Sequence, residues 1–342
     1  MNNSYLSAFS VMAMVVVASV GPAWAGDSLH RNQLAEKSSN QALTGASSSV
    51  LARKAGPGTV AVVSSLGRSL GTSRRMLVGW STYKTDTDSS TSFLTGNGWT
   101  LTVADGGQNV RFRTEPSDPL PEISENSKPS DSTIESWTRE FISNELKSIV
   151  RLGPTEDLVF LGTWFENVST GAVDAKEPGP TLIRKVVGVF GRRIGGLDII
   201  GAGSKVAVIM SVDSRVSGFD VDWPEYESTR TVETGAELGT MTAREQAIAL
   251  RTLGRSTGSM VRSRFECGLH DAGARVSVRT PEIHLACIAR YSASSDDGKA
   301  TAAWVSVIPA AKAIPANAWW PEAAILSGVG WQEDPSYAPD ND

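Results

Sequence analysis

The sequence predicts an α+β fold in which helices pack on antiparallel sheets, with a β-hairpin-rich amino-terminal part. Three observations predict it. Apolar and polar residues alternate, as in half-buried strands, on both sides of the turn formers Asp105, Gly106 and Gly107. Residues 133–150 and 242–253 instead begin with capping boxes and read as helices. Strands and helices do not alternate regularly, so a doubly wound parallel sheet is not expected.

Composition and turn residues divide the chain into segments. The predicted segments are a signal peptide (residues 1–25), a flexible segment (26–58), a β-rich amino-terminal module (59–113), a linker (114–131), a first helix plus antiparallel sheet module (132–226), a second such module (241–331) and a flexible tail (332–342). The mature chain is long enough for about two ordinary domains.

The first 25 residues have the pattern of a secretory signal. Residues 9–20 are almost wholly apolar, and Ala23 and Ala25 form a small-x-small cleavage site. This run of about a dozen residues is shorter than the roughly 20 apolar residues that a bilayer span needs. The chain has no second apolar run long enough to cross a membrane. We therefore expect export, cleavage after Ala25 and a periplasmic or extracellular protein without a membrane span. Residues 1–8 carry no Lys or Arg, which leaves an uncleaved anchor as the alternative.

The β-rich module contains the first predicted strands. Residues 59–64 (TVAVVS) and 76–83 are rich in β formers, and residues 99–103 and 110–113 form the predicted hairpin. Residues 114–131 follow; they are proline-rich and acidic, with few groups to bury, which is typical of a linker.

Each of the two later modules begins with a helix. In residues 133–150 the apolar side chains recur along one face, and Ser132 with Glu135 predicts the amino-terminal cap. Thr242 and Glu245 make the same pattern at the start of the second helix. The predicted strands after the two helices are residues 158–165, 186–190, 197–200, 206–210, 216–222, 265–270, 275–279, 283–291 and 302–308.

Charge and cysteine content narrow the classes of partner. The net charge of −5 gives no basic surface of the kind that nucleic acids require, so no nucleic-acid partner is expected. The chain has two cysteines, Cys267 and Cys287, both in segments with strand patterning. An even cysteine count in an exported protein predicts a disulfide between them.

The glycines of residues 190–223 do not make a nucleotide site. A phosphate-binding loop that starts at Gly196 would need lysine where Ala202 stands, and a dinucleotide motif would need glycine where Val206 stands. Strand patterns, not a helix, follow these glycines. We therefore interpret them as turn residues and expect no cofactor.

The catalytic motifs are weak, and we assign no catalytic residue. Ser69 and Ser256 lie in G-x-S-x-G matches, but neither match leads from a strand into a helix. His270 and His284 would approach each other in a hairpin, yet no third zinc ligand is placed with them, so no metal site is expected. A cluster of carboxylates near residue 223 is interpreted as a solvated strand end; it comprises Asp220, Asp222, Glu225 and Glu227.

Tryptophans gather near the carboxyl terminus. Trp319 and Trp320 lie in a proline-punctuated stretch, between Trp304 and Trp331. Such side chains stack on sugars or anchor a partner protein, so these four residues are a candidate binding surface. The alternative is that they cover the edge of a sheet.

Residues 131–310 resemble PepSY and FTP propeptide domains. The resemblance rests on a glycine-punctuated strand leading to a D-G-x-V turn, here Arg192, Gly196, Leu197, Ile199 and Gly201, then Val206, Val208, Asp213 and Val216, with Ser214 in place of the usual turn glycine. The helix at residue 242 and the late Trp304 also match the pattern of such modules. The resemblance implies PepSY-like repeats in which a helix packs on a curved antiparallel sheet. It also implies a secreted inhibitor or regulator of an extracytoplasmic protease.

Three functions are therefore compared. The leading hypothesis is an exported, non-enzymatic binding module whose partner is an envelope protease. The second is a secreted serine hydrolase that uses Ser69 with His270 or His284. The third is a carbohydrate-binding envelope protein that holds a glycan through its carboxyl-terminal tryptophans.

Overall fold

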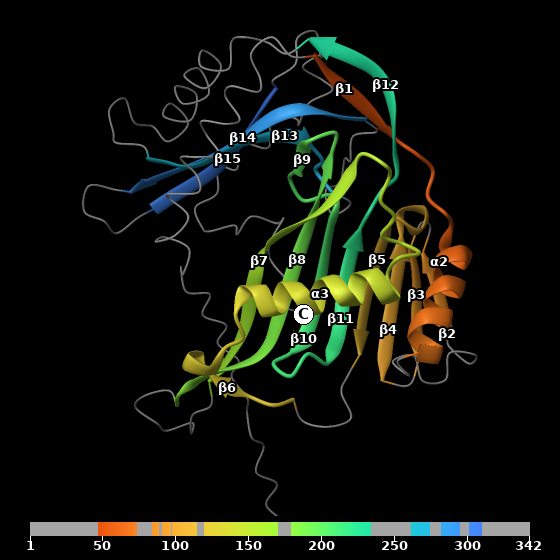
Figure 1. The fold of residues 1–342 in the computed structure, drawn as a ribbon, viewed down its shortest axis with the longest axis vertical. Coiled ribbons are helices and arrows are strands. Elements are labelled where there is room, and N and C mark those ends of the chain that lie inside the picture. The colour runs from red at the N-terminus through yellow and green to blue at the C-terminus, as the bar shows by residue number, and fades with distance from the viewer. Residues whose placement is uncertain are drawn as a thin grey trace, which may run out of the picture.

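One large mixed β-sheet dominates the molecule (Figure 1). The structure is a computed structural model, and it describes residues 47–73, 84–88, 91–96, 98–114, 120–169, 179–233, 261–273, 282–294 and 301–309. The predicted α+β class, with PepSY-like repeats of a helix on an antiparallel sheet, is wrong. The described residues form fifteen strands but only two short α-helices. Strands such as Trp99–Ala104 and Asn109–Thr114 alternate buried and more exposed side chains at the period of a strand.

The strands have the following bounds: β1 Ser47–Arg53, β2 Lys84–Asp88, β3 Thr91–Gly96, β4 Trp99–Ala104, β5 Asn109–Thr114, β6 Ile123–Ser124, β7 Glu156–Ser169, β8 Thr181–Ile194, β9 Leu197–Ile200, β10 Lys205–Ser211, β11 Val216–Asp222, β12 Tyr226–Glu233, β13 Val261–His270, β14 Glu282–Ser294 and β15 Thr301–Pro309. Neighbouring strands follow the order β12-β1-β14-β13-β9-β8-β10-β11-β5-β4-β3-β2, with β15 beside β14, and β6 and β7 beside β8. The pairing of β9 with β13 is parallel, and the other pairings described are antiparallel.

Turn chemistry predicted the hairpins correctly. The predicted hairpin is β4 paired with β5, and a short 3-10 turn over Asp105–Gly107 joins them. Gly195 and Gly196 form the two-residue turn between β8 and β9, both with positive φ (57° and 84°). A turn of this kind needs positive φ at both central positions, which glycine adopts without steric cost. The interpretation of these glycines as turn residues is therefore confirmed.

The segment TVAVVS is a helix, not the predicted strand. It forms most of α2 (Thr59–Leu66), whose buried side chains are Val62, Val63 and Leu66. These residues lie on one helical face, since positions four apart share a face of a helix. Short apolar runs do not distinguish a helix from a strand, and the packing of α2 decided between them here.

The predicted first helix exists, with different ends. It is α3 (Asp131–Glu145), shorter than the predicted range of residues 133–150. The amino-terminal cap is Ser130 rather than Ser132, because Ser130 Oγ accepts a hydrogen bond from the Thr133 N–H at 3.2 Å. The chain leaves the helix at Leu146, although Leu146 and Val150 stay buried. The predicted helix of residues 242–253 lies outside the described residues.

The main hydrophobic core lies between α3 and the sheet. Figure 1 shows α3 crossing the sheet with its carboxyl end toward α2. The buried cluster joins residues of both helices to residues of the sheet, among them Leu66, Ile134, Phe141, Phe112, Phe190, Val208 and Phe219. Close approach of α3 to β8 depends on Gly188, where a Cβ would overlap the side chain of Thr138.

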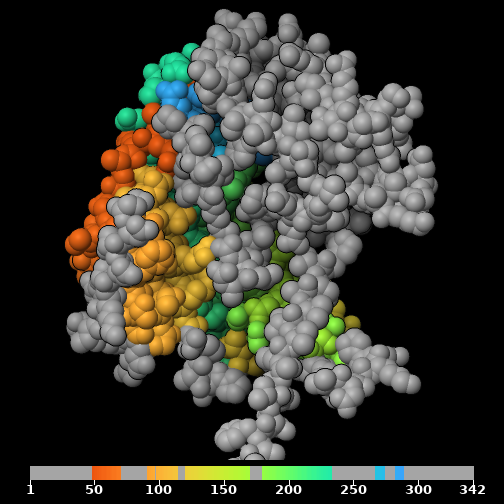
Figure 2. Space-filling model, turned by 180° about the vertical axis from the view of Figure 1, so that it is seen from behind, coloured from red at the N-terminus to blue at the C-terminus, as the bar shows by residue number. Residues whose placement is uncertain are grey.

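The proposed amino-terminal and middle modules share this sheet and core. Strand β5 pairs with β11, and Phe112 stacks on Phe219 with ring centroids 5.3 Å apart. The predicted linker contributes the short strand β6, which pairs with β8 at Ile183. Figure 2 shows the opposite side of the molecule, where residues of β3–β5 (orange) lie beside residues of β8–β11 (green).

A second, smaller core lies at the other end of the sheet. It contains Leu51, Ile199, Leu269 and Ile283, contributed by β1, β9, β13 and β14. The sheet passes from one core to the other through two short contacts. Strand β9 meets β8 at Arg193 and Ile194, and meets β13 at Leu269 and His270.

Candidate functional site

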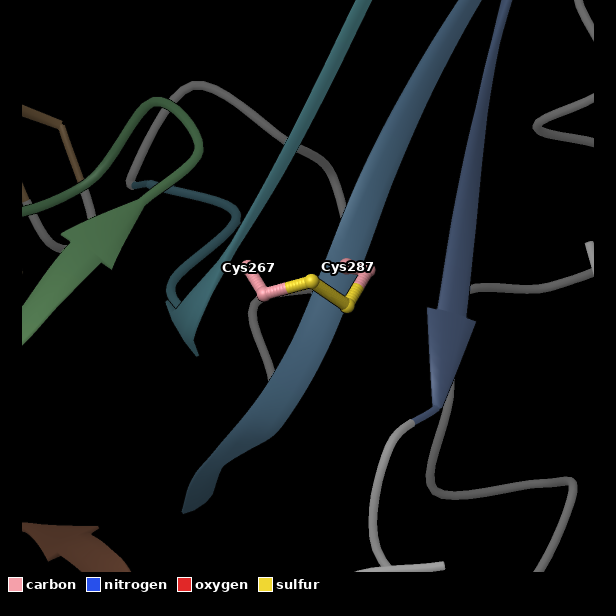
Figure 3. The surroundings of a disulfide bond; sticks show 2 residues. All are labelled: Cys267 and Cys287. Carbon is pink, nitrogen blue, oxygen red and sulfur yellow. A yellow bond between two sulfur atoms is a disulfide. The ribbon is translucent and has the colours of Figure 1, made fainter. Parts of the chain in front are cut away.

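The two cysteines form the predicted disulfide. Cys267 on β13 lies directly opposite Cys287 on β14, with the Cα atoms 4.0 Å apart, and the sulfurs are bonded (Figure 3). Cys287 is fully buried. The bond therefore fixes the pairing of two neighbouring strands in the half of the sheet that carries the smaller core.

The two histidines also lie opposite each other on these strands, as the hairpin pattern predicted. His284 is buried, and burial lowers its pKa. The pKa of His270 is lowered to about 4, chiefly by burial; Asp271 opposes this, while Lys205 and His284 add to it. Within the described chain no group of three or more His, Cys, Asp or Glu side chains is placed to hold a metal ion.

Ser69 is not brought together with either histidine. It lies in a π-helical segment, η1 (Gly67–Ser73), which continues α2, and its hydroxyl donates to the Leu66 carbonyl oxygen at 3.4 Å. Among the described residues that line the cleft beside Ser69, none is a histidine. His30 and Ser256 lie outside the described residues.

Two of the four carboxylates near residue 223, Asp220 and Glu225, are in ion pairs. Asp220 receives two hydrogen bonds from Arg113, at 3.0 and 2.9 Å, and Nε of a second cation, Arg111, lies 3.3 Å from Asp220 Oδ1. Glu225 lies 3.5 Å from Arg151. Asp220 therefore bridges β5 and β11 through these ion pairs.

The tryptophan surface stays a prediction. Trp304 lies on β15, opposite Tyr291 on β14, but its side chain is outside the described set. Trp319, Trp320 and Trp331 lie outside the described residues altogether.

A buried arginine that the sequence analysis did not assign a role lies at the centre of the sheet. Arg192 on β8 is paired with Glu156 on β7 through two hydrogen bonds of 2.6 Å. Its guanidinium lies 5.0 Å from the ring centroid of Trp223 and 5.2 Å from that of Tyr226. Only 3% of the Arg192 side chain and 10% of the Glu156 side chain are exposed. Burying a charged pair costs free energy of desolvation. Here the ion pair itself and the cation–π contacts of Arg192 with two aromatic rings offset that cost.

A second buried polar group ties the two halves of the sheet together. Asp271 accepts hydrogen bonds from Tyr226 Oη at 2.6 Å and Ser204 Oγ at 3.2 Å. A Cβ at Gly203 would overlap the Asp271 carboxylate, so glycine is needed there for close approach. The buried ammonium of Lys205 donates to the carbonyl oxygens of Ile199 (2.8 Å) and Gly203.

Burial lowers the pKa of Lys205, and the nearby carboxylate of Asp271 opposes that shift. Ser204 and Asp271 are both at most 1% exposed, so a ligand does not reach them from solvent. This group is therefore an internal tie between β10, β12 and the end of β13, and not a binding site. Sequence patterns did not reveal it because its members are far apart along the chain.

In the part of the chain that the structure describes, a polar cleft open to solvent lies between η1 and the carboxyl end of α3. Its volume is about 500 Å³, within the usual range for small-molecule sites. The lining consists of polar side chains: Ser65, Arg68, Ser69, Asn144, Glu145, Lys147 and Ser148. Glu145 is buried, whereas Arg68 and Lys147 are exposed.

The cleft exists because two sequence segments 80 or so residues apart pack together through their apolar faces. Leu66 and Leu70 from α2 and η1, and Ile142 and Leu146 from α3, are all in the main core. The polar residues between these apolar positions are then left facing one another across the cleft. The only sequence signal for this site was the G-x-S-x-G match at Ser69, which marked the place without indicating its chemistry.

Comparison with known proteins identifies no relative by sequence. No protein-family model matches the chain, and no curated protein matches it. Among solved structures, the crystal structure of an uncharacterized protein from Eubacterium rectale aligns with a TM-score of 0.45 and 9% sequence identity. The alignment covers 77% of this chain and 84% of that protein.

Proposed function

We propose that this chain is an exported, non-enzymatic binding protein, and that the polar cleft between η1 and α3 is its binding site. The observation that carries the proposal is the cleft itself: about 500 Å³ of accessible space, lined by hydroxyl, amide and charged side chains. Side chains of these kinds supply the oriented hydrogen bonds that small-molecule sites use for specificity.

Two features support export. The Cys267–Cys287 disulfide is of the kind that persists in oxidising compartments outside the cytoplasm. No helix of the described chain is long and apolar enough to cross a bilayer. We propose that residues 1–25 direct secretion and are removed after Ala25. The intact mass of the secreted protein tests this step, and a mass that includes residues 1–25 would contradict it.

The proposal does not extend to a protease as the partner. That role was implied by the resemblance to PepSY and FTP domains, whose helix-on-sheet repeats are not the architecture found here. The partner class is left to experiment.

The test of binding is affinity capture by the mature protein from envelope and culture-medium fractions. Small molecules and proteins retained by the column are identified by mass spectrometry. We expect specific retention that excess free protein competes away. Retention equal to that of a column carrying heat-denatured protein would overturn the binding function.

The same protein distinguishes the hydrolase alternative. A fluorophosphonate probe labels an activated serine, and Ser69 donates its hydroxyl to a backbone carbonyl instead of a base. We expect no labelling. Labelling that is lost in Ser69→Ala would establish a serine hydrolase and overturn the non-enzymatic proposal.

A further inference from the structure

We infer that the cleft between η1 and α3 binds the oxyanionic group of a small polar ligand, with Arg68 and Lys147 as the residues that recognise it. This inference rests on the proposed function, because it names the ligand class of the same cleft. Both side chains line the cleft, and both are exposed.

These two cations have no carboxylate partner among the described residues, whereas most other described arginines do. Most of the arginines with described side chains are in ion pairs, for example Arg113 with Asp220, Arg184 with Glu166 and Arg192 with Glu156. Arg68 makes one hydrogen bond, from Nε to the Ser64 carbonyl oxygen at 3.3 Å. Lys147 makes no ion pair or side-chain hydrogen bond with any residue that the structure describes.

The Arg68 hydrogen bond orients the side chain without using its terminal nitrogens. Nη1 and Nη2 are the pair that binds a carboxylate or phosphate in bidentate fashion. Lys147 supplies a second, mobile positive charge in the same cleft. Two positively charged hydrogen-bond donors in one cleft are the kind of groups that bind an oxyanion.

The charge and polarity of the lining also favour an anionic, polar ligand. Among the described residues of the lining, Arg68 and Lys147 are cations and Glu145 is the one carboxylate. Glu145 is buried while the two cations are exposed, so a ligand entering from solvent meets positive charge first. The described residues of the lining include no aromatic or aliphatic side chain, which disfavours an apolar ligand.

The uncharged polar side chains of the cleft indicate which other groups the ligand carries. Ser65, Ser69 and Asn144 border the cleft and can exchange hydrogen bonds with hydroxyl groups. The inferred ligand is therefore a small hydroxylated molecule that carries a phosphate or a carboxylate. A bare hydroxylated molecule without the charge would lack the contacts to both cations.

Isothermal titration of the full-length mature protein tests the inference. The probes are glycerol 3-phosphate, glycerate, inorganic phosphate and glycerol. We expect glycerol 3-phosphate or glycerate to bind more tightly than phosphate, and glycerol not to bind. Binding of glycerol as tight as that of glycerol 3-phosphate, or no binding of any of the anionic probes, would overturn the inference.

Charge-matched variants separate the cleft from general electrostatics. Arg68→Gln and Lys147→Gln should each weaken anion binding by about tenfold, the usual effect of losing a charge-assisted hydrogen bond. Lys54→Gln is the control, because Lys54 is exposed, has no ion pair among the described residues and is not part of the cleft. Equal weakening by Lys54→Gln would show non-specific attraction and overturn the site.

The outcome also separates this inference from the proposed function. If the column captures the same partner with the Arg68→Gln, Lys147→Gln double variant as with the unmodified protein, binding stands and the oxyanion site is rejected. If the anionic probes bind and the two variants lose them, the oxyanion site is supported whatever the column captures. Thermal unfolding of each ligand-free variant checks that the substitutions leave the fold intact.

Discussion

Ser214 occupies a turn position that favours glycine. It lies between β10 and β11 with a φ of 68°, and its side chain is exposed. Residues with a Cβ are strained in this left-handed region, which is why glycine is favoured there. The turn is held by the Ser214 N–H, which donates to the Ser211 carbonyl oxygen at 3.0 Å.

Ser214→Gly should raise the free energy of unfolding by about 0.5–1 kcal/mol, because glycine relieves this strain. Urea denaturation measures the change. Ser228→Gly is the matched control: Ser228 is an exposed strand residue without positive φ, and there glycine should destabilise. A loss of stability in Ser214→Gly would contradict the expectation.

The start of α3 offers a second test of a single hydroxyl. Ser130→Ala removes the acceptor of the Thr133 N–H and should destabilise the protein by about 1 kcal/mol. Ser132→Ala should cost less, because Ser132 Oγ contacts Ser130 Oγ and is not the cap. Urea midpoints in the reverse order would return the cap to Ser132.

At the scale of elements, the contact between α3 and β8 depends on a residue without a side chain. Gly188 lies under Thr138, which is fully buried and whose hydroxyl has no hydrogen-bond partner among the described residues. Gly188→Ala would place a methyl group against Thr138 Oγ1 and force the helix outward. Overpacking of this kind typically costs about 1–3 kcal/mol.

A double-mutant cycle tests this contact. Thr138→Ala removes the atoms that a Cβ at Gly188 would overlap, so the double variant Gly188→Ala, Thr138→Ala should lose less stability than the two single losses added together. Urea denaturation of the four proteins gives the coupling energy. Strict additivity would show that α3 does not press on β8 at this point.

Elements were predictable where local chemistry determines them. Alternation and turn residues placed β4, β5, β9 and β11, because strand period and turn conformation are local properties. The helix α2 was mistaken for a strand because Val62, Val63 and Leu66 suit either structure until their packing is known. The neighbour order of the strands, and hence the fold class, depends on contacts between distant segments, such as β1 with β12 and β9 with β13.

Sites that depend on contacts between distant segments could not be predicted from the sequence either. The disulfide was predictable because two cysteines leave one pairing. The polar cleft was not, because Arg68 and Lys147 come from segments that meet only in the folded chain. The interaction of Arg192 with Glu156, Trp223 and Tyr226 was missed for the same reason.

At the scale of the whole molecule, the two halves of the sheet meet around charged groups. Strand β13 reaches β9 through Leu269 and His270, and Asp271 continues the contact by exchanging backbone hydrogen bonds with Ile200 and Gly203. Lys205 and Asp271 are buried beside this junction. A change of charge beside Lys205 and Asp271 should therefore alter the stability of the contact between the two halves of the sheet.

His270 makes this junction sensitive to acid. Burial, with contributions from Lys205 and His284 and against that of Asp271, lowers the pKa of His270 to about 4 in the folded protein. In the unfolded chain the pKa is near its ordinary value of about 6.5. Between these values the unfolded chain binds a proton that the folded protein does not, so stability is full above about pH 6.5, falls as the pH approaches 4 and levels off below it. The shift corresponds to a loss of up to roughly 3 kcal/mol.

Urea denaturation from pH 7.5 to 4 should therefore show a steeper decline for the unmodified protein than for His270→Gln, which lacks the titrating group while every other acid and base is shared. Parallel pH profiles for the two proteins would show that His270 keeps an ordinary pKa and that the junction does not respond to acid through it.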